Sequence, residues 1–148
     1  MVNRRAHPRS FFSKEEKERI LKAIRQAERE TSGEIRVYLE HQPVPNVLEH
    51  TKKIFSKLGM TKTKQRNAIL IYLSLRGRQL AVIGDEGIHQ KVGDDFWRKA
   101  VSEIERHFSR EDFTEGLEAG IHLMGSQLKK HFPRGRGDIN ELPDEISG

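Results

Sequence analysis

Two acidic pairs lie close together in the sequence, in a chain whose net charge is +5. Asp85 and Glu86 follow an apolar run and a glycine, and Asp94 and Asp95 precede a second, strongly apolar segment. Carboxylates at this spacing repel one another unless a positive charge lies between them. Because Ca²⁺ takes oxygen ligands and tolerates irregular geometry, these residues predict a site for a divalent cation, Ca²⁺ or else Mg²⁺.

Four further polar residues fit a site of this kind. Asn67 stands at the start of an apolar run, and its amide oxygen is a suitable calcium ligand. Lys62, Lys64 and Arg66 precede it and have the charge needed to hold a phosphate group. With a metal-activated water as nucleophile, this set would suit hydrolysis of a phosphomonoester, so an enzyme is the alternative to a binding module.

Each group also has a purely structural interpretation. The first acidic pair fits a tight turn, where aspartate bonds its own backbone. The second pair fits the N-cap and first turn of a helix, where negative charge is favoured. The three basic side chains fit an ordinary solvated loop. The sequence alone leaves these alternatives open.

Other chemistries are excluded by composition and motif. The chain has no cysteine, so disulfides, thiolate metal sites and cysteine nucleophiles are absent. It contains no serine nucleophile elbow, P-loop, dinucleotide fingerprint or EF-hand loop. The pI is near 9.6, but the basic clusters are scattered and no aromatic residues are interleaved with them. We therefore expect a solvated basic surface rather than a nucleic-acid interface, and a protein partner stays open.

The 148 residues are enough for one domain with a hydrophobic core. We expect a basic, flexible arm over residues 1–12, an α/β domain over 13–132 and a flexible tail over 133–148. The arm lacks the apolar run of a secretory signal, and no later segment approaches the roughly 20 apolar residues of a membrane span. These features predict a cytoplasmic protein.

Hydrophobic periodicity predicts the order α-β-α-β-β-α-α. A capping box at Ser13 and Glu16 starts the first helix, which we expect to end at Ser32 and Gly33. The next segment alternates polar and apolar residues, as in a strand with one exposed face. Residues 68–73 are almost continuously apolar, which favours a central strand, and residues 79–83 return as its hairpin partner. The acidic pairs are expected in a loop after this hairpin. A three-layer α/β/α sandwich around a small mixed sheet would bury this pattern.

With these elements placed, the sequence resembles the TPM domain family. Five segments carry the resemblance: residues 31–37 (T-S-G-E-I-R-V), 55–60 (F-S-K-L-G-M), 66–71 (R-N-A-I-L-I), 83–88 (I-G-D-E-G-I) and 113–117 (F-T-E-G-L). They are similar, in order and spacing, to the family patterns T-G-x-x-I-x-V, l-f-x-x-w-g-i-g, D-N-G-v-L-l, v-G-y-G-l-e and y-x-x-G-l. The resemblance implies an α/β/α sandwich that binds divalent cations, above all Ca²⁺, near the loops between the strands. For some members it implies weak phosphatase activity.

Three positions depart from the family pattern. Arg66 stands where the family has the acidic residue of D-N-G, Ala68 replaces its glycine, and Asp85 takes the second position of the G-y-G turn. A role of the family's acidic residue in metal binding or hydrolysis therefore cannot pass to Arg66. This departure weakens the phosphatase interpretation more than the cation-binding one.

Overall fold

The computed structural model describes residues 4–135, 146 and 147. In order, it contains α1 (Lys14–Glu28), β1 (Glu34–Glu40), α2 (Val47–Lys57), the 3-10 turn η1 (Met60–Lys62), β2 (Ala68–Ser74), β3 (Gln79–Gly84), α3 (Glu86–Phe108), α4 (Phe113–His131) and the short β4 (Ile146–Ser147). The predicted succession of helices and strands is confirmed. Strand β4 is an addition that the sequence pattern did not indicate.

The strands form one mixed sheet in the order β3-β2-β1-β4. Strands β1 and β2 are parallel, with Glu34 beside Ala68, whereas β2 and β3 form the predicted antiparallel hairpin. The start of β1, the start of β2 and the end of β3 consequently lie side by side at one end of the strands. The hairpin turn lies at the opposite end of the strands.

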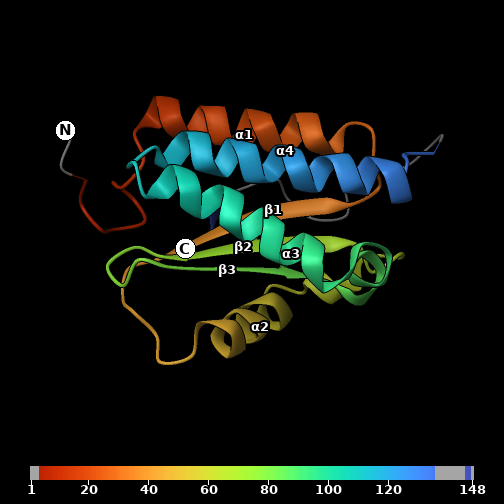
Figure 1. Cartoon of the computed structure of the whole chain (residues 1–148), viewed down its shortest axis with the longest axis horizontal. Helices are drawn as coiled ribbons and strands as arrows, with labels where there is room; N and C mark the ends of the chain where they lie inside the picture. Colours follow the sequence, from red (N-terminus) through yellow and green to blue (C-terminus); the bar gives the residue numbers. More distant parts are fainter. Residues whose placement is uncertain (1–3, 136–145, 148) are drawn as a thin grey trace.

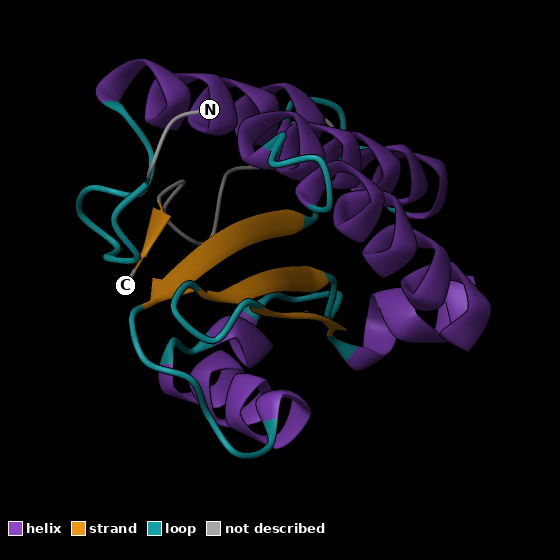
Figure 2. Ribbon diagram, turned by 60° about the vertical axis from the view of Figure 1, so that its left-hand side comes forward, coloured by secondary structure: helices purple, strands orange, loops and turns teal. Residues whose placement is uncertain are grey.

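Helices cover both faces of this sheet (Figures 1 and 2). Helices α1, α3 and α4 pack on one face, where the odd-numbered residues of β1 and β2, such as Val37 and Ile71, enter the larger core. Helix α2 covers the other face, where Leu70 packs with Ile54 and Phe55. Every residue of β2 is buried, as expected for a central strand. The predicted three-layer α/β/α sandwich is confirmed.

The first helix starts where its capping box predicts and ends earlier than expected. Ser13 Oγ accepts from the Glu16 amide at 3.1 Å, and Glu16 Oε1 accepts from the Ser13 amide at 2.9 Å. The helix ends at Glu28, before the expected Ser32 and Gly33. Thr31 explains the difference, since its buried hydroxyl donates to backbone carbonyls at the end of α4 and so fixes an extended connection to β1.

Strand β1 has no exposed face, contrary to the alternating pattern. Glu34 and Arg36, the expected solvent-facing residues, are buried. Tyr38, which lies on the same face as these two residues, packs against the core beneath α2, so this face is covered. Strand β4 also pairs with β1 on the side away from β2, with Val37 beside Ile146, which makes β1 an interior strand. A short strand contributed from the end of the chain is invisible to local periodicity.

The segment expected to be an acidic loop is helical. Asp85 is the N-cap of α3, and the helix continues through Val92 to a kink at Gly93, whose φ is +76° and ψ 173°. Ile88 is fully buried and anchors this first part of the helix. A backbone conformation of this kind is accessible to glycine and to few other residues, so Gly93 sets the change of direction.

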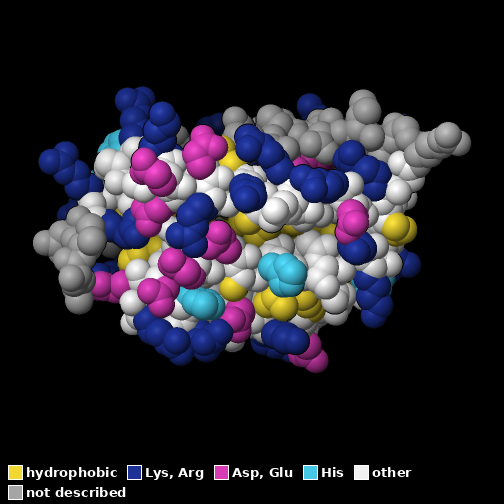
Figure 3. Space-filling view, turned by 90° about the horizontal axis from the view of Figure 1, so that it is seen from above, with side chains coloured by type: hydrophobic (Ala, Val, Ile, Leu, Met, Phe, Trp, Pro, Cys, Tyr) yellow, Lys and Arg dark blue, Asp and Glu magenta, His cyan; other side chains and the backbone are white. Residues whose placement is uncertain are grey.

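The remaining surface agrees with a densely charged chain. Seen from above, Lys and Arg side chains alternate with Asp and Glu over the helical layer (Figure 3). Among the described residues, no helix combines the length and the apolar character required to cross a bilayer. Most of the predicted tail, residues 136–145 and 148, lies outside the described part of the chain. In the predicted arm, Phe12 is buried in the core.

Candidate functional site

The end of β3 brings two carboxylates onto one guanidinium. Asp85 is only 6% exposed, and its Oδ2 and Oδ1 lie 2.6 and 2.8 Å from Nε and Nη2 of Arg66. Glu86 Oε1 lies 2.9 Å from Nη1 of the same guanidinium. The positive charge expected between the acidic residues is therefore supplied, in this structure, by the protein itself. We call this group of three residues the Arg66 clamp.

The backbone holds Asp85 in place for this contact. Its amide donates to the Ala68 carbonyl at 2.9 Å, which extends the β2–β3 pairing by one bond. Its Oδ1 also accepts from the Glu86 amide at 2.9 Å, so the carboxylate caps the N-terminus of α3. The structural alternative for Asp85 is thus realised, as a helix cap rather than a turn. Oδ1 therefore serves both the cap and one of the two contacts with Arg66, while Oδ2 contacts Arg66 alone.

Arg66 itself adopts an unusual backbone conformation. Its φ is +53°, in the left-handed region that bulky residues seldom enter. The hydrogen bonds that Arg66 donates to Asp85, followed by the charges of Asp85 and Glu86, raise the pKa of the Arg66 guanidinium above its already high usual value. The guanidinium is therefore a permanent positive charge, and only a competing cation or a movement of the side chain would free the carboxylates.

Asn67 lies just before the start of β2, as expected, and only 1% of its surface is exposed. Its amide nitrogen Nδ2 donates to Ser32 Oγ at 3.1 Å, and its backbone amide donates to Thr63 Oγ1 at 3.1 Å. Its Oδ1 is buried and has no hydrogen-bond partner among the described residues. An orphaned buried acceptor costs about 1–3 kcal/mol, so this oxygen is available to a ligand.

The second acidic pair is not brought to the clamp. Asp94 and Asp95 follow the kink at Gly93 and are 77% and 95% exposed. Asp94 Oδ1 lies 3.6 Å from His89 Nε2, and Asp95 pairs with Arg98. In the described ranges, no three Asp, Glu, His or Cys side chains form a group able to hold a metal ion. Participation of Asp94 and Asp95 in a shared site stays a prediction.

Of the three predicted phosphate-binding residues, Arg66 is paired with the acidic residues, whereas the two lysines are not part of that contact. Lys62 ends η1 and Lys64 lies in the following loop, and both side chains are exposed. Arg66, the third member, directs its guanidinium at Asp85 and Glu86, with its side chain 40% exposed. A phosphate held by all three cations would have to compete with two carboxylates for Arg66. The observation gives the phosphatase alternative no specific support.

Sequence reasoning missed the pairing of Arg66 with Asp85, which are 19 residues apart. It also missed the indole of Trp97, which donates to His89 Nδ1 at 2.9 Å and packs against Gly84. A signal for the first pairing was present. In the resemblance described above, Arg66 stands where the family pattern is acidic and Asp85 is an additional acid. Such a charge exchange is what a new ion pair requires.

Known proteins with similar sequences and structures identify the family of this fold. A family model described as the TPM domain matches residues 6–127. The solution structure of the BA42 protein from the psychrophilic bacterium Bizionia argentinensis is 41% identical, covering 93% of this chain and 94% of that chain, with a TM-score of 0.86. No curated protein matches the chain.

Two further structures share the fold at low identity. The N-terminal domain of a P. gingivalis protein is 21% identical, with coverages of 84% of this chain and 83% of that chain and a TM-score of 0.67. The N-terminal domain of the cg2496 protein of Corynebacterium glutamicum is 18% identical, with coverages of 88% and 81% and a TM-score of 0.63. From the match over residues 6–127 and the relative at 41% identity, we conclude that the chain belongs to the TPM domain family.

Proposed function

We propose that this TPM domain is a binding module for a divalent cation, Ca²⁺ in preference to Mg²⁺, and that the cation competes with Arg66 for Asp85 and Glu86. The observation that carries the proposal is the convergence of two carboxylates on a single positive group at distances of 2.6–2.9 Å. Carboxylates arranged to share one cation are a suitable starting set for another.

The chemistry of the donors fits a hard cation. Asp85 and Glu86 supply carboxylate oxygens, and Asn67 supplies the buried amide oxygen that has no partner among the described residues. Ca²⁺ accepts such mixed oxygen ligands in irregular geometry, whereas Mg²⁺ demands near-ideal octahedral geometry and keeps several waters. These three residues would hold the ion, and the exposed position of Glu86 leaves room for water ligands.

Competition with Arg66 would give the module a regulatory character. A bound cation takes the place of the guanidinium, so Arg66 and the preceding loop are released when the cation concentration rises. We therefore expect the wild-type domain to bind Ca²⁺ weakly, because binding must first displace the bidentate contact between Arg66 and Asp85.

Substitution of the competitor provides the test. Replacing Arg66 with glutamine is expected to raise the affinity for Ca²⁺ by about tenfold or more, because the cation no longer has to displace a guanidinium from Asp85. Without Ca²⁺ the variant should be less stable than wild type, because Asp85 then lies buried without a counter-charge. With Ca²⁺ its melting temperature should recover.

The affinity can be measured by calcium titration of thermal melts and of tryptophan fluorescence. Trp97 is the only tryptophan in the sequence and lies against Gly84, next to Asp85, so its emission reports on the site. Lys64→Gln is the matched control: it removes an exposed cation from the same loop, and we expect an affinity change below about threefold. An Arg66→Gln variant whose melt is insensitive to millimolar Ca²⁺ would refute the proposal.

A second pair of variants tests the ligand set. Asp85→Asn, made in the Arg66→Gln background, should abolish the response to Ca²⁺, whereas Asp95→Asn in the same background should retain it if the site is confined to the clamp. Loss of the response in both would restore the wider site predicted from the sequence. Titration with Mg²⁺ should give a weaker response in every variant.

A further inference from the structure

A cavity of about 620 Å³ opens at the hairpin end of the strands, opposite to the end that carries the Arg66 clamp. Three segments enclose it: the N-terminal arm, the turn between β2 and β3, and the junction between α3 and α4, which lie together at the left of Figure 1. The volume is within the range of about 300–1,000 Å³ that is typical of small-molecule sites. Nothing assigned to the clamp extends into this cavity.

The apolar lining of the cavity comes from all three segments. Phe11 belongs to the arm, Leu73 and Leu80 to the hairpin, and Phe108 and Phe113 to the junction. Phe113 lies 5.1 and 5.3 Å from Phe11 and Phe108 between ring centroids, in edge-to-face contacts. Such a lining suits the apolar or aromatic body of a ligand.

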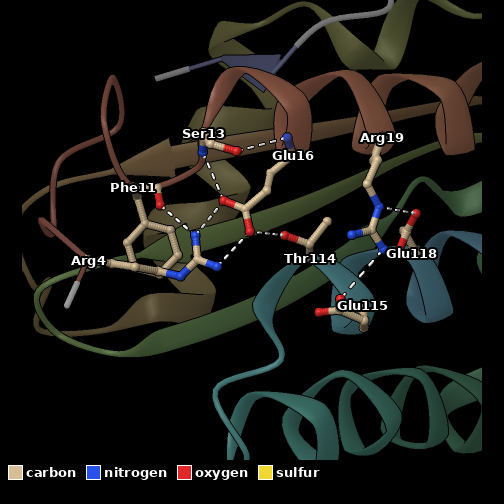
Figure 4. A network of polar contacts seen from close by, with 8 residues as sticks. All are labelled: Arg4, Phe11, Ser13, Glu16, Arg19, Thr114, Glu115 and Glu118. Atoms are coloured by element: carbon tan, nitrogen blue, oxygen red, sulfur yellow. Dashed lines mark hydrogen bonds and ion pairs between the residues drawn. The ribbon is translucent and has the colours of Figure 1, made fainter. Parts of the chain in front are cut away.

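Charges of both signs border this lining without pairing. Arg78 on the hairpin, and Glu105 and Glu111 at the junction, are exposed and form no ion pair within the described part of the chain. Arg76 makes one long contact, 3.4 Å, to Gln42. Arg4, by contrast, also borders the cavity but is committed to Glu16 (Figure 4).

The backbone is strained at two of these charged positions. Arg78 and Glu111 have φ values of +51° and +64°, and with Arg66 they are the non-glycine residues with positive φ in the described ranges. Each occupies a place where glycine is the usual choice: the end of a four-residue hairpin loop, and the residue that ends a helix in the left-handed conformation. A bulky residue is strained in this conformation, and such strain gathers at functional sites.

The glycine next to Arg78 in the hairpin turn is required for a different reason. Gly77 stands one residue before Arg78, and a Cβ at Gly77 would lie 2.6 Å from Cβ of Pro43. Close packing against Pro43 therefore accounts for glycine at position 77. Arg78 adopts a positive φ without being glycine, and a charge offered to a ligand would account for that choice.

We infer that this cavity binds a small zwitterion with an apolar body, the chemistry of an aromatic α-amino acid or of a short apolar peptide. The apolar body lies against the phenylalanine and leucine side chains. The carboxylate of the ligand pairs with Arg78, where a guanidinium fork matches its geometry. The ammonium group pairs with Glu105 or Glu111. Neither a purely anionic nor a purely cationic ligand satisfies both sets of charges.

Three matched probes test this assignment on the full chain. L-phenylalanine carries both charges, 3-phenylpropionate only the negative one, and 2-phenylethylamine only the positive one. We expect L-phenylalanine to bind about tenfold tighter than either analogue, with NMR shifts confined to residues such as Leu73, Leu80 and Phe113. The dipeptide phenylalanyl-leucine separates the two sources: tighter binding than L-phenylalanine assigns the site to peptides, and weaker binding assigns it to amino acids.

Variants that do not threaten the fold complete the test. Arg78→Gly and Glu111→Gly relieve a positive φ, so each should melt at the same temperature as wild type or higher while binding of L-phenylalanine falls about tenfold. Arg110→Gln, an exposed neighbour outside the cavity lining, should leave binding unchanged. The assignment is overturned by equal binding of all three probes, by no binding at millimolar concentration, or by equal losses in the Arg110 control.

Discussion

Replacing Gly87 with alanine is expected to lower the free energy of unfolding by about 2–4 kcal/mol. The sign is opposite to the usual one, because alanine at an ordinary exposed helix position is about 1 kcal/mol better than glycine. A Cβ at position 87 would lie 2.0 Å from the Gln65 carbonyl oxygen and 2.6 Å from that of Arg66. Both are backbone atoms, so the overlap can be relieved only by moving α3 or the loop before β2.

The substitution should be compared by urea unfolding with Gln90→Ala, an exposed position one turn further along α3. We expect that control to change the free energy by no more than about 0.5 kcal/mol. The Ile88 amide donates to the Arg66 carbonyl at 3.3 Å, next to the altered residue. A displaced loop would therefore also disturb the Arg66 clamp, and Trp97 emission should change together with stability. A Gly87→Ala protein as stable as wild type would show that this contact is not close-packed.

Local signals were sufficient for most of the fold. Ser13 and Glu16 satisfy each other's backbone donors within four residues, so their pattern could be recognised without tertiary information. The continuous apolar run of β2 likewise indicated a strand buried on both faces. These elements, in their order, were enough to favour a three-layer sandwich, since each has one apolar surface that must be covered.

What the sequence concealed depends on contacts between distant segments. Glu34 and Arg36 look exposed in the pattern of β1 but are buried, on a face of the sheet where Tyr38 packs against the core beneath α2. Asp85 and Glu86 look like loop residues, because the glycine beside them conceals a helix whose start is fixed by packing on the loop before β2. Periodicity reports on one element at a time and cannot register either event.

The sequence indicated which residues belong to the candidate site, but not which of them contact one another. The repulsion argument required a positive charge near Asp85, and it was correct in that respect. The sequence analysis assigned that charge to a divalent cation and did not consider Arg66 for it. The antiparallel pairing of β2 and β3 places the loop of Arg66 beside the end of β3, with Ile69 opposite Gly84. The cavity at the hairpin end of the strands could not be predicted from the sequence for a related reason, since its lining comes from three separate segments.

The stability of the N-terminal arm is expected to depend on one carboxylate, Glu16. Its two oxygens each lie 2.6 Å from a nitrogen of Arg4, and Thr114 Oγ1 donates to it at 2.9 Å (Figure 4). The hydrogen bonds from Arg4, with those from the Ser13 amide and Thr114, lower the pKa of Glu16 to about 2. The contact joins the arm to α1 and α4, and Arg4 also lies over the ring of Phe11.

A lowered pKa in the folded state means that folding favours the ionised carboxylate. Its stabilisation is complete above the unfolded value near 4.5 and is lost as the pH falls from there towards 2. We therefore expect Glu16→Gln to cost about 2–3 kcal/mol at pH 7. Near pH 3 the difference between variant and wild type should shrink to about half or less, because the wild-type carboxylate is then losing the same interaction.

Urea unfolding at the two pH values, with Glu15→Gln as control, separates this effect from a general loss of charge. Glu15 is the exposed neighbour on the same turn and should cost less than about 0.5 kcal/mol at either pH. A double-mutant cycle with Arg4→Gln should return most of the Glu16 effect as coupling energy. Because Arg4 and Phe11 form one wall of the cavity, Glu16→Gln should also weaken L-phenylalanine binding at pH 7. A penalty that is the same at both pH values would contradict the ionic origin and attribute the effect to helix capping by Glu16.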